Sequence, residues 1–269
     1  MEKYIIEWQG KWALVTGASA GIGKALAEEL AAGGTNLVLT ARRRERLEAL
    51  ATSLSTTHKI RAEIFVADLA DPAGPETILA FTRAKNIPID LLINNAGFGA
   101  YGEFATSDRS RQLEMVQVNC AAVVNLTHLF LPAMIERRSG DILILASTAS
   151  FQAVPYITVY AATKAFDLSF AEGLAEEVKH HGVRVCALCP GSTESEFREV
   201  ASQSNVPAAN TRSETAEKVA RTGLKALAAG KSYVISGAGN YFGAHMQRLV
   251  PRRVVTSIAA KMFRPRGKT

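Results

Sequence analysis

The stretch Trp12-Ala13-Leu14-Val15-Thr16-Gly17-Ala18-Ser19-Ala20-Gly21-Ile22-Gly23 determines how this 269-residue chain folds. Residues 12–16 predict a buried strand, and a helical pattern begins near residue 22. The small residues between them allow a sharp turn, so that Gly21 and Gly23 leave room for a pyrophosphate at the positive end of the helix. The spacing is G-x-x-x-G-x-G and not G-x-G-x-x-G. By itself it indicates either a dinucleotide site or a merely tight turn.

Short apolar segments alternate with helical patterns outward from this turn. Strands are expected at 12–16, 36–41, 61–66, 91–94, 141–146, 183–188 and 233–235, and helices near 22–32, 44–54, 75–86, 110–137, 158–180 and 214–229. This alternation predicts an α/β fold: a single-domain, Rossmann-type, doubly wound parallel sheet flanked by helices.

The predicted dinucleotide-binding and catalytic domain covers residues 1–244, and a basic tail covers 245–269. The aperiodic segment 192–213 follows a strand, which is where a substrate lid or a surface loop without a role is expected.

Composition limits the class of protein. Apolar residues make up 48% of the chain and charged residues 21%, which fits one sizeable core. Three cysteines suit a reducing compartment, no apolar run approaches the ~18–20 residues of a membrane span, and the start carries Glu2 and Glu7 instead of a signal-peptide pattern. These features predict a cytoplasmic protein.

The net charge of +6 is unevenly distributed. No Asp or Glu follows Glu217, and residues 218–269 hold eleven Lys and Arg, which leaves 20 basic against 25 acidic residues before them. The sequence pI of 9.3 therefore reflects the C-terminal part, and we expect no nucleic-acid partner.

Further motifs follow in chain order at the expected strand ends and helix starts. They are Asn94-Asn95-Ala96-Gly97, Asn119, Ser147, Tyr160-Ala161-Ala162-Thr163-Lys164 and Pro190-Gly191. With the glycine turn, they make the chain resemble the short-chain dehydrogenase/reductase family over about residues 10–240. The resemblance implies an oxidoreductase that transfers a hydride between a nicotinamide cofactor and a carbonyl or secondary alcohol. The catalytic residues that it implies are Asn119, Ser147, Tyr160 and Lys164.

The resemblance also implies a set of cofactor-binding residues. They are Gly17, Ser19, Ala20, Gly21, Ile22, Gly23, Asp68, Leu69, Asn95, Ala96, Gly97, Pro190 and Gly191, with Tyr160 and Lys164 at the nicotinamide end. Asp68 is equally compatible with a helix cap or a turn. Where the family commonly has a threonine that contacts the nicotinamide amide, this chain has Ser195, with Thr193 two residues earlier; we expect Thr193 to make the contact.

The residues after the second strand indicate NADP(H) in preference to NAD(H). Ala41 stands where a carboxylate would accept a hydrogen bond from the 2′-hydroxyl of NAD, and Arg42 follows it. A guanidinium pairs bidentately with a phosphate, so we expect Arg42 to contact the 2′-phosphate, while Arg44 and Arg46 form a solvated helix start. Ala20 occupies the family's other basic position.

Tyr160 and Lys164 are four residues apart, so they share a helix face. A free tyrosine has a pKa near ~10, and a nearby cation lowers it. We expect Lys164, together with the positive nicotinamide, to lower the pKa of Tyr160. By the resemblance, Lys164 also contacts the nicotinamide ribose. Ser147 is expected to hydrogen-bond the substrate oxygen, and Asn119 to hold a water that connects Lys164 to solvent.

Apolar residues after the fourth and fifth strands predict an apolar substrate: a 3-oxoacyl compound, a steroid-like compound or another hydrophobic ketone. They are Phe98, Tyr101, Phe151, Val154 and Tyr156, and ordinary loop packing is the alternative for each. The family resemblance implies a homodimer or homotetramer through the helices at 110–137 and 158–180. A catalytically silent, NADP(H)-sensing binding protein is the alternative function.

Two other patterns have less specific interpretations. The tail interleaves apolar and basic residues after Pro251, which predicts a basic amphipathic helix for peripheral membrane contact; closing the pocket, packing on a neighbouring subunit or fraying are the alternatives. Cys186 and Cys189 have C-x-x-C spacing, but residues three apart in a strand point to opposite faces. We expect no metal site.

Overall fold

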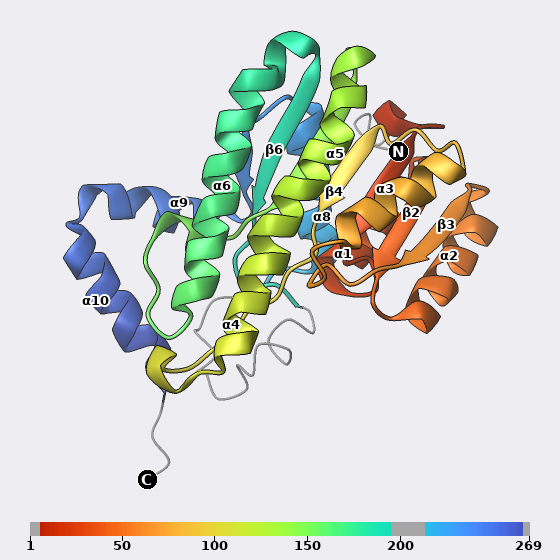
Figure 1. The fold of residues 1–269 in the computed structure, drawn as a ribbon. Helices are drawn as coiled ribbons and strands as arrows, with labels where there is room; N and C mark the ends of the chain where they lie inside the picture. Colours follow the sequence, from red (N-terminus) through yellow and green to blue (C-terminus); the bar gives the residue numbers. More distant parts are fainter. Residues whose placement is uncertain (1–5, 195–212, 266–269) are drawn as a thin grey trace.

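The computed structural model describes residues 6–194 and 213–265, and its centre is one parallel sheet (Figure 1). The strand order is β3-β2-β1-β4-β5-β6-β7, with Leu14 of β1 opposite both Val38 of β2 and Leu92 of β4. The strands are β1 Trp12–Thr16, β2 Asn36–Ala41, β3 Ala62–Val66, β4 Leu91–Asn94, β5 Gly140–Leu145, β6 Val183–Cys189 and β7 Tyr233–Ile235. The predicted doubly wound α/β fold is confirmed.

Helices cover both faces of this sheet, as Figure 1 shows. The longer helices are α1 Gly21–Ala32, α2 Arg44–His58, α3 Gly74–Ala84, α4 Arg109–Val116, α5 Ala122–Glu136, α6 Thr158–Val178, α8 Ala216–Ala228, α9 Ala238–Met246 and α10 Arg252–Phe263. Short helical turns are η1 Ile6–Trp8, η2 Phe104–Thr106, η3 Gln117–Ala121, η4 Thr148–Phe151, η5 Lys179–His181 and η7 Gln247–Leu249. One core lies between the sheet and α3, α5 and α6; the other lies between it and α1, α2 and α8.

The strand order reverses beside β1, because β2 and β3 lie on one side of it and β4 to β7 on the other. At such a reversal, the connections that leave neighbouring strands diverge to opposite faces of the sheet, and ligands bind in the crevice between them. The glycine turn after β1 therefore lies at the predicted binding edge.

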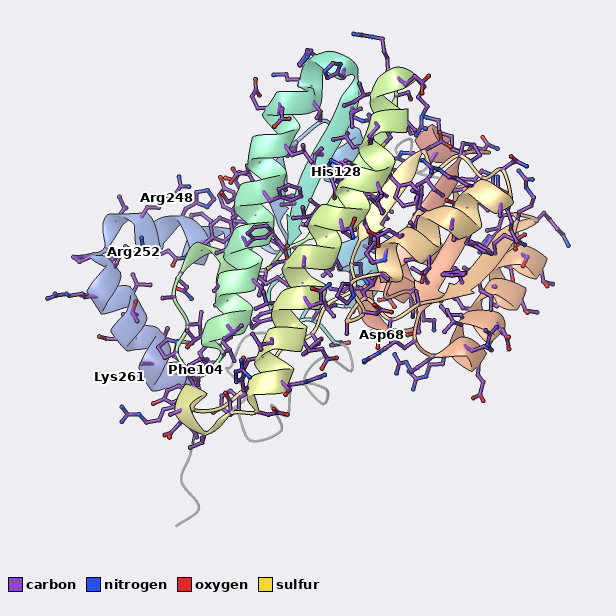
Figure 2. The ribbon with its side chains drawn as sticks, in the orientation of Figure 1. Asp68, Phe104, His128, Arg248, Arg252 and Lys261 are labelled. Atoms are coloured by element: carbon purple, nitrogen blue, oxygen red, sulfur yellow. The ribbon has the colours of Figure 1, made fainter. Side chains whose placement is uncertain are left out.

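The described part of the basic tail, residues 245–265, is folded and packs on the body of the protein. Helix α10 begins at Arg252, directly after Pro251. The boundary expected between residues 244 and 245 falls inside α9. The hydroxyl of Tyr101 donates to the carbonyl of Phe263 at 2.8 Å, while Arg248, Arg252 and Lys261 project outward (Figure 2). Of the expected lid at 192–213, residues 195–212 lie outside the described part of the chain.

The helix expected at 110–137 is α4, η3 and α5 in sequence, and η3 is a π-helical turn. Length and composition alone would let Arg109–Glu136 cross a membrane, which corrects the expectation that no apolar run is long enough. In this fold, 44% of its most apolar window is buried, and a single helix that passes this test is weak evidence for a span.

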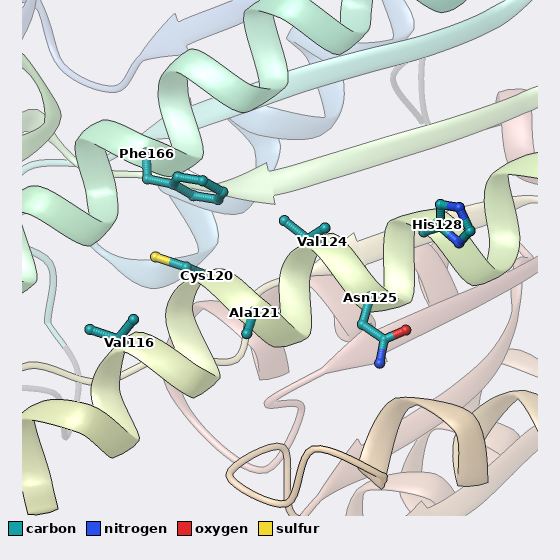
Figure 3. A pocket seen from close by; sticks show the side chains of 7 residues that line it. All are labelled: Val116, Cys120, Ala121, Val124, Asn125, His128 and Phe166. Atoms are coloured by element: carbon teal, nitrogen blue, oxygen red, sulfur yellow. The ribbon is translucent and has the colours of Figure 1, made fainter.

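The outer face of this helix borders a shallow hollow of about 500 Å³ (Figure 3). Residues of α4, η3 and α5 line it together with Phe166 of α6; they are Val116, Cys120, Ala121, Val124, Asn125 and His128. The hollow is almost entirely apolar apart from Asn125 and His128.

The two cysteines of β6 lie in different cores, Cys186 on the side of α8 and Cys189 on the side of α6, as the strand geometry predicts. Neither forms a disulfide. Within residues 6–194 and 213–265, no three His, Cys, Asp or Glu side chains are placed to hold a metal ion.

Candidate active site

A cavity of about 490 Å³ lies at the carboxyl ends of the strands and extends from the glycine turn to α6. Every residue that the sequence predicted to bind cofactor lines it, and so do Ser147, Tyr160 and Lys164. Of the predicted catalytic residues, Asn119 alone is outside the lining. The structure thus brings together residues from positions 17 to 193.

The glycine turn is held against the end of β4. The Thr16 hydroxyl accepts from the backbone N–H groups of Asn95 and Ala96, each at 2.9 Å, and the Asn95 amide donates to the Thr16 carbonyl at 2.8 Å. Gly17 has a φ of +66°, which favours glycine. A Cβ at Gly23 would collide with the Asn95 amide and the Gly17 carbonyl.

No side chain caps the start of α1, where Ala20 is extended. The first N–H groups of a helix have no partner within the helix, and they carry the positive end of its dipole. Because Gly21 and Ile22 line the cavity, this helix end can receive an anionic group there. The glycine turn and this helix end together fit a pyrophosphate.

Two arginines stand at the end of β2. Arg42 lies between two carboxylates, with its Nη1 3.9 Å from Asp68 and 3.5 Å from Glu114. Arg43 reaches back to the glycine turn, where its Nε and Nη2 donate to the Ser19 hydroxyl at 3.2 and 3.0 Å. Sequence reasoning named only Arg42 and missed Arg43 and Glu114, although both line the cavity.

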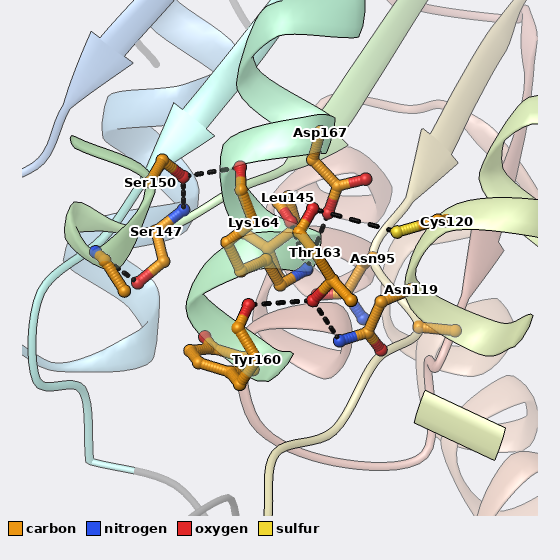
Figure 4. A network of polar contacts seen from close by, with 12 residues as sticks. Asn95, Asn119, Cys120, Leu145, Ser147, Ser150, Tyr160, Thr163, Lys164 and Asp167 are labelled. Carbon is orange, nitrogen blue, oxygen red and sulfur yellow. Dashed lines mark hydrogen bonds and ion pairs between the residues drawn. The ribbon is translucent and has the colours of Figure 1, made fainter. Parts of the chain in front are cut away.

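Ser147 is positioned by the short helix η4. Its hydroxyl accepts from the N–H of Ala149 at 3.1 Å, and its own N–H donates to Ser150 Oγ at 3.2 Å. Ser150 in turn donates to the carbonyl of Lys164 at 2.6 Å (Figure 4). The end of β5 is therefore joined to α6.

Tyr160 and Lys164 lie one turn apart on α6, as predicted. The Lys164 ammonium donates to the Leu145 carbonyl at 2.6 Å and to Asp167 Oδ2 at 3.0 Å. Burial lowers the pKa of Lys164, but the charge of Asp167, the charge of Tyr160 and the hydrogen bond with Asp167 raise it, and the net pKa is above its ordinary value. The site thus contains a fixed, buried cation.

Lys164 lowers the pKa of Tyr160, as expected, but the net pKa lies above its ordinary value. Burial raises this pKa, and the charge of Lys164 and a hydrogen bond with Ser147 lower it by less. The charge of Asp167 raises it as well. In this structure the hydroxyl is therefore a protonated phenol at neutral pH.

Asn119 lies in the π-helical turn η3 and is fully buried. Its amide donates to the Phe98 carbonyl and to Thr163 Oγ1, both at 3.0 Å, and its Oδ1 accepts from the Phe98 N–H at 3.1 Å. The side chain therefore connects the loop after β4 to α6. Its expected water contact stays a prediction.

The wall near Tyr160 is apolar and includes the C-terminal helix. Phe98, Val118, Ala149, Ile157 and Phe263 line this part of the cavity. Of the other predicted pocket residues, Tyr101 and Val154 pack behind the lining with α10, Phe151 packs on Tyr233, and Tyr156 has a φ of +69° in the loop before α6. The contribution of Phe263 was left open in the sequence among several roles for the tail.

The edge after β6 completes the lining with Pro190, Gly191, Ser192 and Thr193. The Thr193 hydroxyl donates to the Gly191 carbonyl at 3.2 Å. Ser195, the other residue considered for this contact, lies outside the described part of the chain.

Comparisons with known proteins agree with this geometry. A family model for short chain dehydrogenases matches residues 11–205. The inactive hydroxysteroid dehydrogenase-like protein 1 of Homo sapiens is 35% identical over 189 residues, which cover 69% of this chain and 57% of that protein. The very-long-chain 3-oxoacyl-CoA reductase of Bos taurus is 36% identical over 187 residues, which cover 68% of this chain and 59% of that enzyme. The match thus spans a little more than half the length of these relatives.

Among solved structures, a short-chain dehydrogenase from Sphingobium yanoikuyae in complex with NADPH superposes with a TM-score of 0.79 at 28% identity. The superposition covers 89% of this chain and 94% of that one. Together with the glycine turn and the Ser147, Tyr160 and Lys164 group, these matches show that the chain belongs to the short-chain dehydrogenase family of oxidoreductases.

Proposed function

We propose that this protein is an NADP(H)-dependent oxidoreductase that interconverts a carbonyl and a secondary alcohol on an apolar substrate. The observation that supports it best is the fixed Lys164 ammonium beside Tyr160 and Ser147, on one wall of a cavity whose other end is the glycine turn. The cation, the proton donor and the turn that can receive an anionic group thus line the same cavity.

The lining fits a nicotinamide dinucleotide part by part. The turn at Gly17 to Gly23 would hold the pyrophosphate, and Asp68 and Leu69 would contact the adenine. Asn95 to Gly97 would line the middle of the cofactor. Pro190, Gly191 and Thr193 would contact the nicotinamide amide, and Lys164 its ribose. When bound, the nicotinamide supplies or accepts the hydride.

The side chains supply the proton and the alignment. Tyr160 would donate its phenolic proton to the substrate oxygen during reduction and take it back during oxidation. Ser147 would hydrogen-bond the same oxygen as charge develops on it. Asn119 would help to hold a water that connects Lys164 to solvent.

The apolar wall at Phe98, Ile157 and Phe263 favours a hydrophobic ketone, such as a 3-oxoacyl or steroid-like compound. The test is NADPH oxidation by the purified protein with a panel of acyl, steroid and bulky aryl ketones. Turnover of apolar ketones in preference to small polar ones is expected, and turnover of only small acids would contradict the substrate class.

The alternative is a catalytically silent protein that senses NADP(H), and one observation favours it: a relative at 35% identity is named inactive. This chain has Ser147, Tyr160 and Lys164 in one cavity, which is why we prefer the enzyme. NADPH binding by fluorescence without oxidation across the whole panel would support the sensor.

We predict that Arg42→Ala raises the KM for NADPH by at least ~10-fold and changes the KM for NADH little, because hydrogen bonds between charged groups contribute about 1.5–3 kcal/mol. Arg43→Ala should act in the same direction, since its guanidinium lies on Ser19 of the turn. Arg44→Ala, at a position exposed on α2, is the matched control. Equal effects on both cofactors would contradict an NADP(H) preference.

We further propose a cytoplasmic protein with a membrane-peripheral fraction, held by the outer face of α10. Val254, Ile258 and Met262 recur every four residues on this face and are 46%, 54% and 51% exposed. Arg252, Arg253 and Lys261 are exposed beside them (Figure 2). Apolar residues flanked by cations fit an anionic bilayer surface, and Phe263 at the end of the same helix lines the cavity.

We predict that the triple change Val254→Ser, Ile258→Asn and Met262→Gln lowers binding to phosphatidylglycerol-containing vesicles at least ~10-fold, since each buried methylene contributes about 0.8 kcal/mol. Leu113→Gln, at an apolar residue of α4 that is 54% exposed, is the control. Vesicle flotation at two salt concentrations is the measurement. Binding that is absent in the wild type, or the same in all variants, contradicts membrane contact.

We also propose a homodimer or homotetramer in which the hollow on α5 and α6 is covered by a second copy (Figure 3). We predict that Phe166→Asp, at an apolar side chain 42% exposed, reduces the mass seen by sedimentation, to one chain from a homodimer and to two chains or fewer from a homotetramer. Phe242→Asp, on α9 and away from this hollow, should not. An unchanged mass for Phe166→Asp would exclude this face.

A further inference from the structure

Asp167 forms a buried ion pair with Lys164 that the chemistry above does not require. It lies one turn after Lys164 on α6, and its side chain is fully buried. Its Oδ2 accepts from the Lys164 ammonium at 3.0 Å, and its Oδ1 has no hydrogen-bond partner (Figure 4). Asp167 is not part of the cavity lining, so any effect on the reaction would pass through Lys164.

The ammonium has three N–H groups, and the protein uses two of them. One donates to the Leu145 carbonyl at the end of β5 and one to Asp167. Because Lys164 lines the cavity, the third is left for a group bound there. Two fixed hydrogen bonds determine where that third N–H points.

Asp167 is also a countercharge for Lys164. Lys164 lowers the pKa of Tyr160, whereas Asp167 raises it. Two thiols also interact with this pair: Cys120 of η3 raises the pKa of Lys164, and Lys164 lowers the pKa of Cys189 of β6. Burial raises the pKa of Cys120 to about 12 and raises that of Cys189 as well, so both thiols are neutral at neutral pH. The charge that Tyr160 experiences therefore depends on the balance between Lys164 and Asp167.

We propose that Asp167 is a positioning residue for Lys164: it directs the third N–H into the cavity, and its negative charge limits how strongly Lys164 favours the phenolate of Tyr160. This inference rests on the proposed function, because it assigns Asp167 a part in the same proton transfer. Asp167 therefore sets the pH at which the pair formed by the Tyr160 phenol and the Lys164 ammonium loses its first proton.

The direction of the effect follows from the charges. Asp167→Asn keeps the size and an oxygen that can accept from Lys164, but it removes the negative charge. Because Asp167 raises the pKa of Tyr160, its loss should let Tyr160 ionise at a pH lower by about one unit, the smaller end of what a nearby charge contributes. Reduction needs the phenol, so its alkaline limb moves to lower pH; oxidation needs the phenolate, so its rising limb moves the same way.

The experiment is the pH dependence of kcat/KM in both directions, together with the ultraviolet titration of Tyr160. That titration is the difference between each protein and its Tyr160→Phe counterpart, and it requires no turnover. The proposal is supported if, in Asp167→Asn, the pH limb of kcat/KM and the phenolate titration both move down by about one pH unit. Unchanged or higher values overturn it, even if the rate falls.

Two variants separate charge from structure. Asp141→Asn changes another buried carboxylate, which pairs with Arg184 near the start of β5, and it should reduce stability without moving the titration. Asp167→Glu retains the charge and should titrate near the wild type; a shift as large as that of Asp167→Asn would contradict the role of charge. If Asp167→Asn does not fold, Asp167→Ser replaces it, and formate should restore the wild-type titration; no response to formate counts against the proposal.

The two proposals fail in different ways. If no ketone is reduced but the Tyr160 titration still shifts in Asp167→Asn, the proposed reaction is wrong and the positioning role stands. If ketones are reduced and the titration does not move, the enzyme stands and the role of Asp167 is wrong.

Discussion

Replacing Tyr160 by Phe is expected to lower kcat/KM for ketone reduction by at least ~100-fold while NADPH binding stays close to wild type. The variant keeps the ring, which packs against the same core as its neighbours, and loses only the hydroxyl. That hydroxyl is the proton donor in the proposed reaction, and general acids typically contribute 10²–10⁴-fold. Stopped-flow or steady-state NADPH oxidation gives the rate, and fluorescence titration gives the affinity.

Tyr101→Phe is the matched control, because its hydroxyl bonds the Phe263 carbonyl at the apolar wall and lies outside the reacting group. A small loss is expected there. Equal rates for Tyr160→Phe and wild type would remove Tyr160 from the chemistry. Equal losses in the two variants would indicate that only pocket shape matters.

The rates of reduction and oxidation should change with pH in opposite directions. Burial holds the pKa of Tyr160 above its ordinary value, so the phenol predominates at neutral pH. Reduction should therefore proceed at neutral pH and decline as the pH rises through that pKa. Oxidation should rise over the same interval, since it needs the phenolate as base.

The fold was predictable because the pattern repeats. Seven apolar segments were separated by helical periods, and a buried parallel strand must be apolar on both faces. The strand ends then placed Gly17, Asn95, Ser147 and Pro190 at one edge of the sheet, so motifs far apart in sequence were expected to meet. That expectation needs only the strand order, which the alternation itself favours.

What the sequence did not predict depends on side-chain direction or on long-range packing. Arg42 and Arg43 are adjacent in the chain, yet one turns to Asp68 and Glu114 and the other to Ser19. Phe263 enters the cavity lining only because α10 folds back onto Tyr101. The π-helical turn at Asn119 adds a residue to an otherwise regular helical pattern, and no periodicity reveals it.

The net pKa of Tyr160 could not be predicted from the spacing for a related reason. A helical spacing of four shows that a cation is near, but it does not show how deeply the phenol is buried or what else the cation contacts. Here burial outweighs Lys164, and Asp167 partly cancels its charge. The spacing of Asp167 from Lys164 was visible, but its complete burial was not.

Removing the positive member of this pair should destabilise the protein strongly. Lys164→Met leaves Asp167, which is fully buried, without the ammonium 3.0 Å away. Breaking a buried pair by deleting one partner typically costs about 3–5 kcal/mol, because an uncompensated charge remains. We expect a lower urea midpoint at pH 8, measured by circular dichroism, and loss of ketone reduction.

The loss of stability in Lys164→Met should be smaller in acid, and the pKa of Asp167 gives the direction of this pH dependence. Burial raises the pKa of Asp167 to about 6 even though Lys164 lowers it. Without Lys164 the folded pKa is higher still, while the unfolded pKa is near ~3.9. When the pKa of a carboxyl is higher in the folded than in the unfolded protein, the folded state is favoured at a pH below the unfolded pKa. That stabilisation is lost as the pH rises through the folded pKa. The stability gap between Lys164→Met and wild type should therefore be small near pH 4 and large at pH 8.

The double variant Lys164→Met, Asp167→Leu separates charge from packing. Replacing both members of a buried pair by apolar residues is often neutral or stabilising, so its midpoint at pH 8 should return toward wild type and lose the pH dependence of the single variant. Ketone reduction should stay absent, because the ammonium that faces the cavity is gone. A double variant no more stable than Lys164→Met would mean that cavity size, and not the unpaired carboxylate, destabilises the fold.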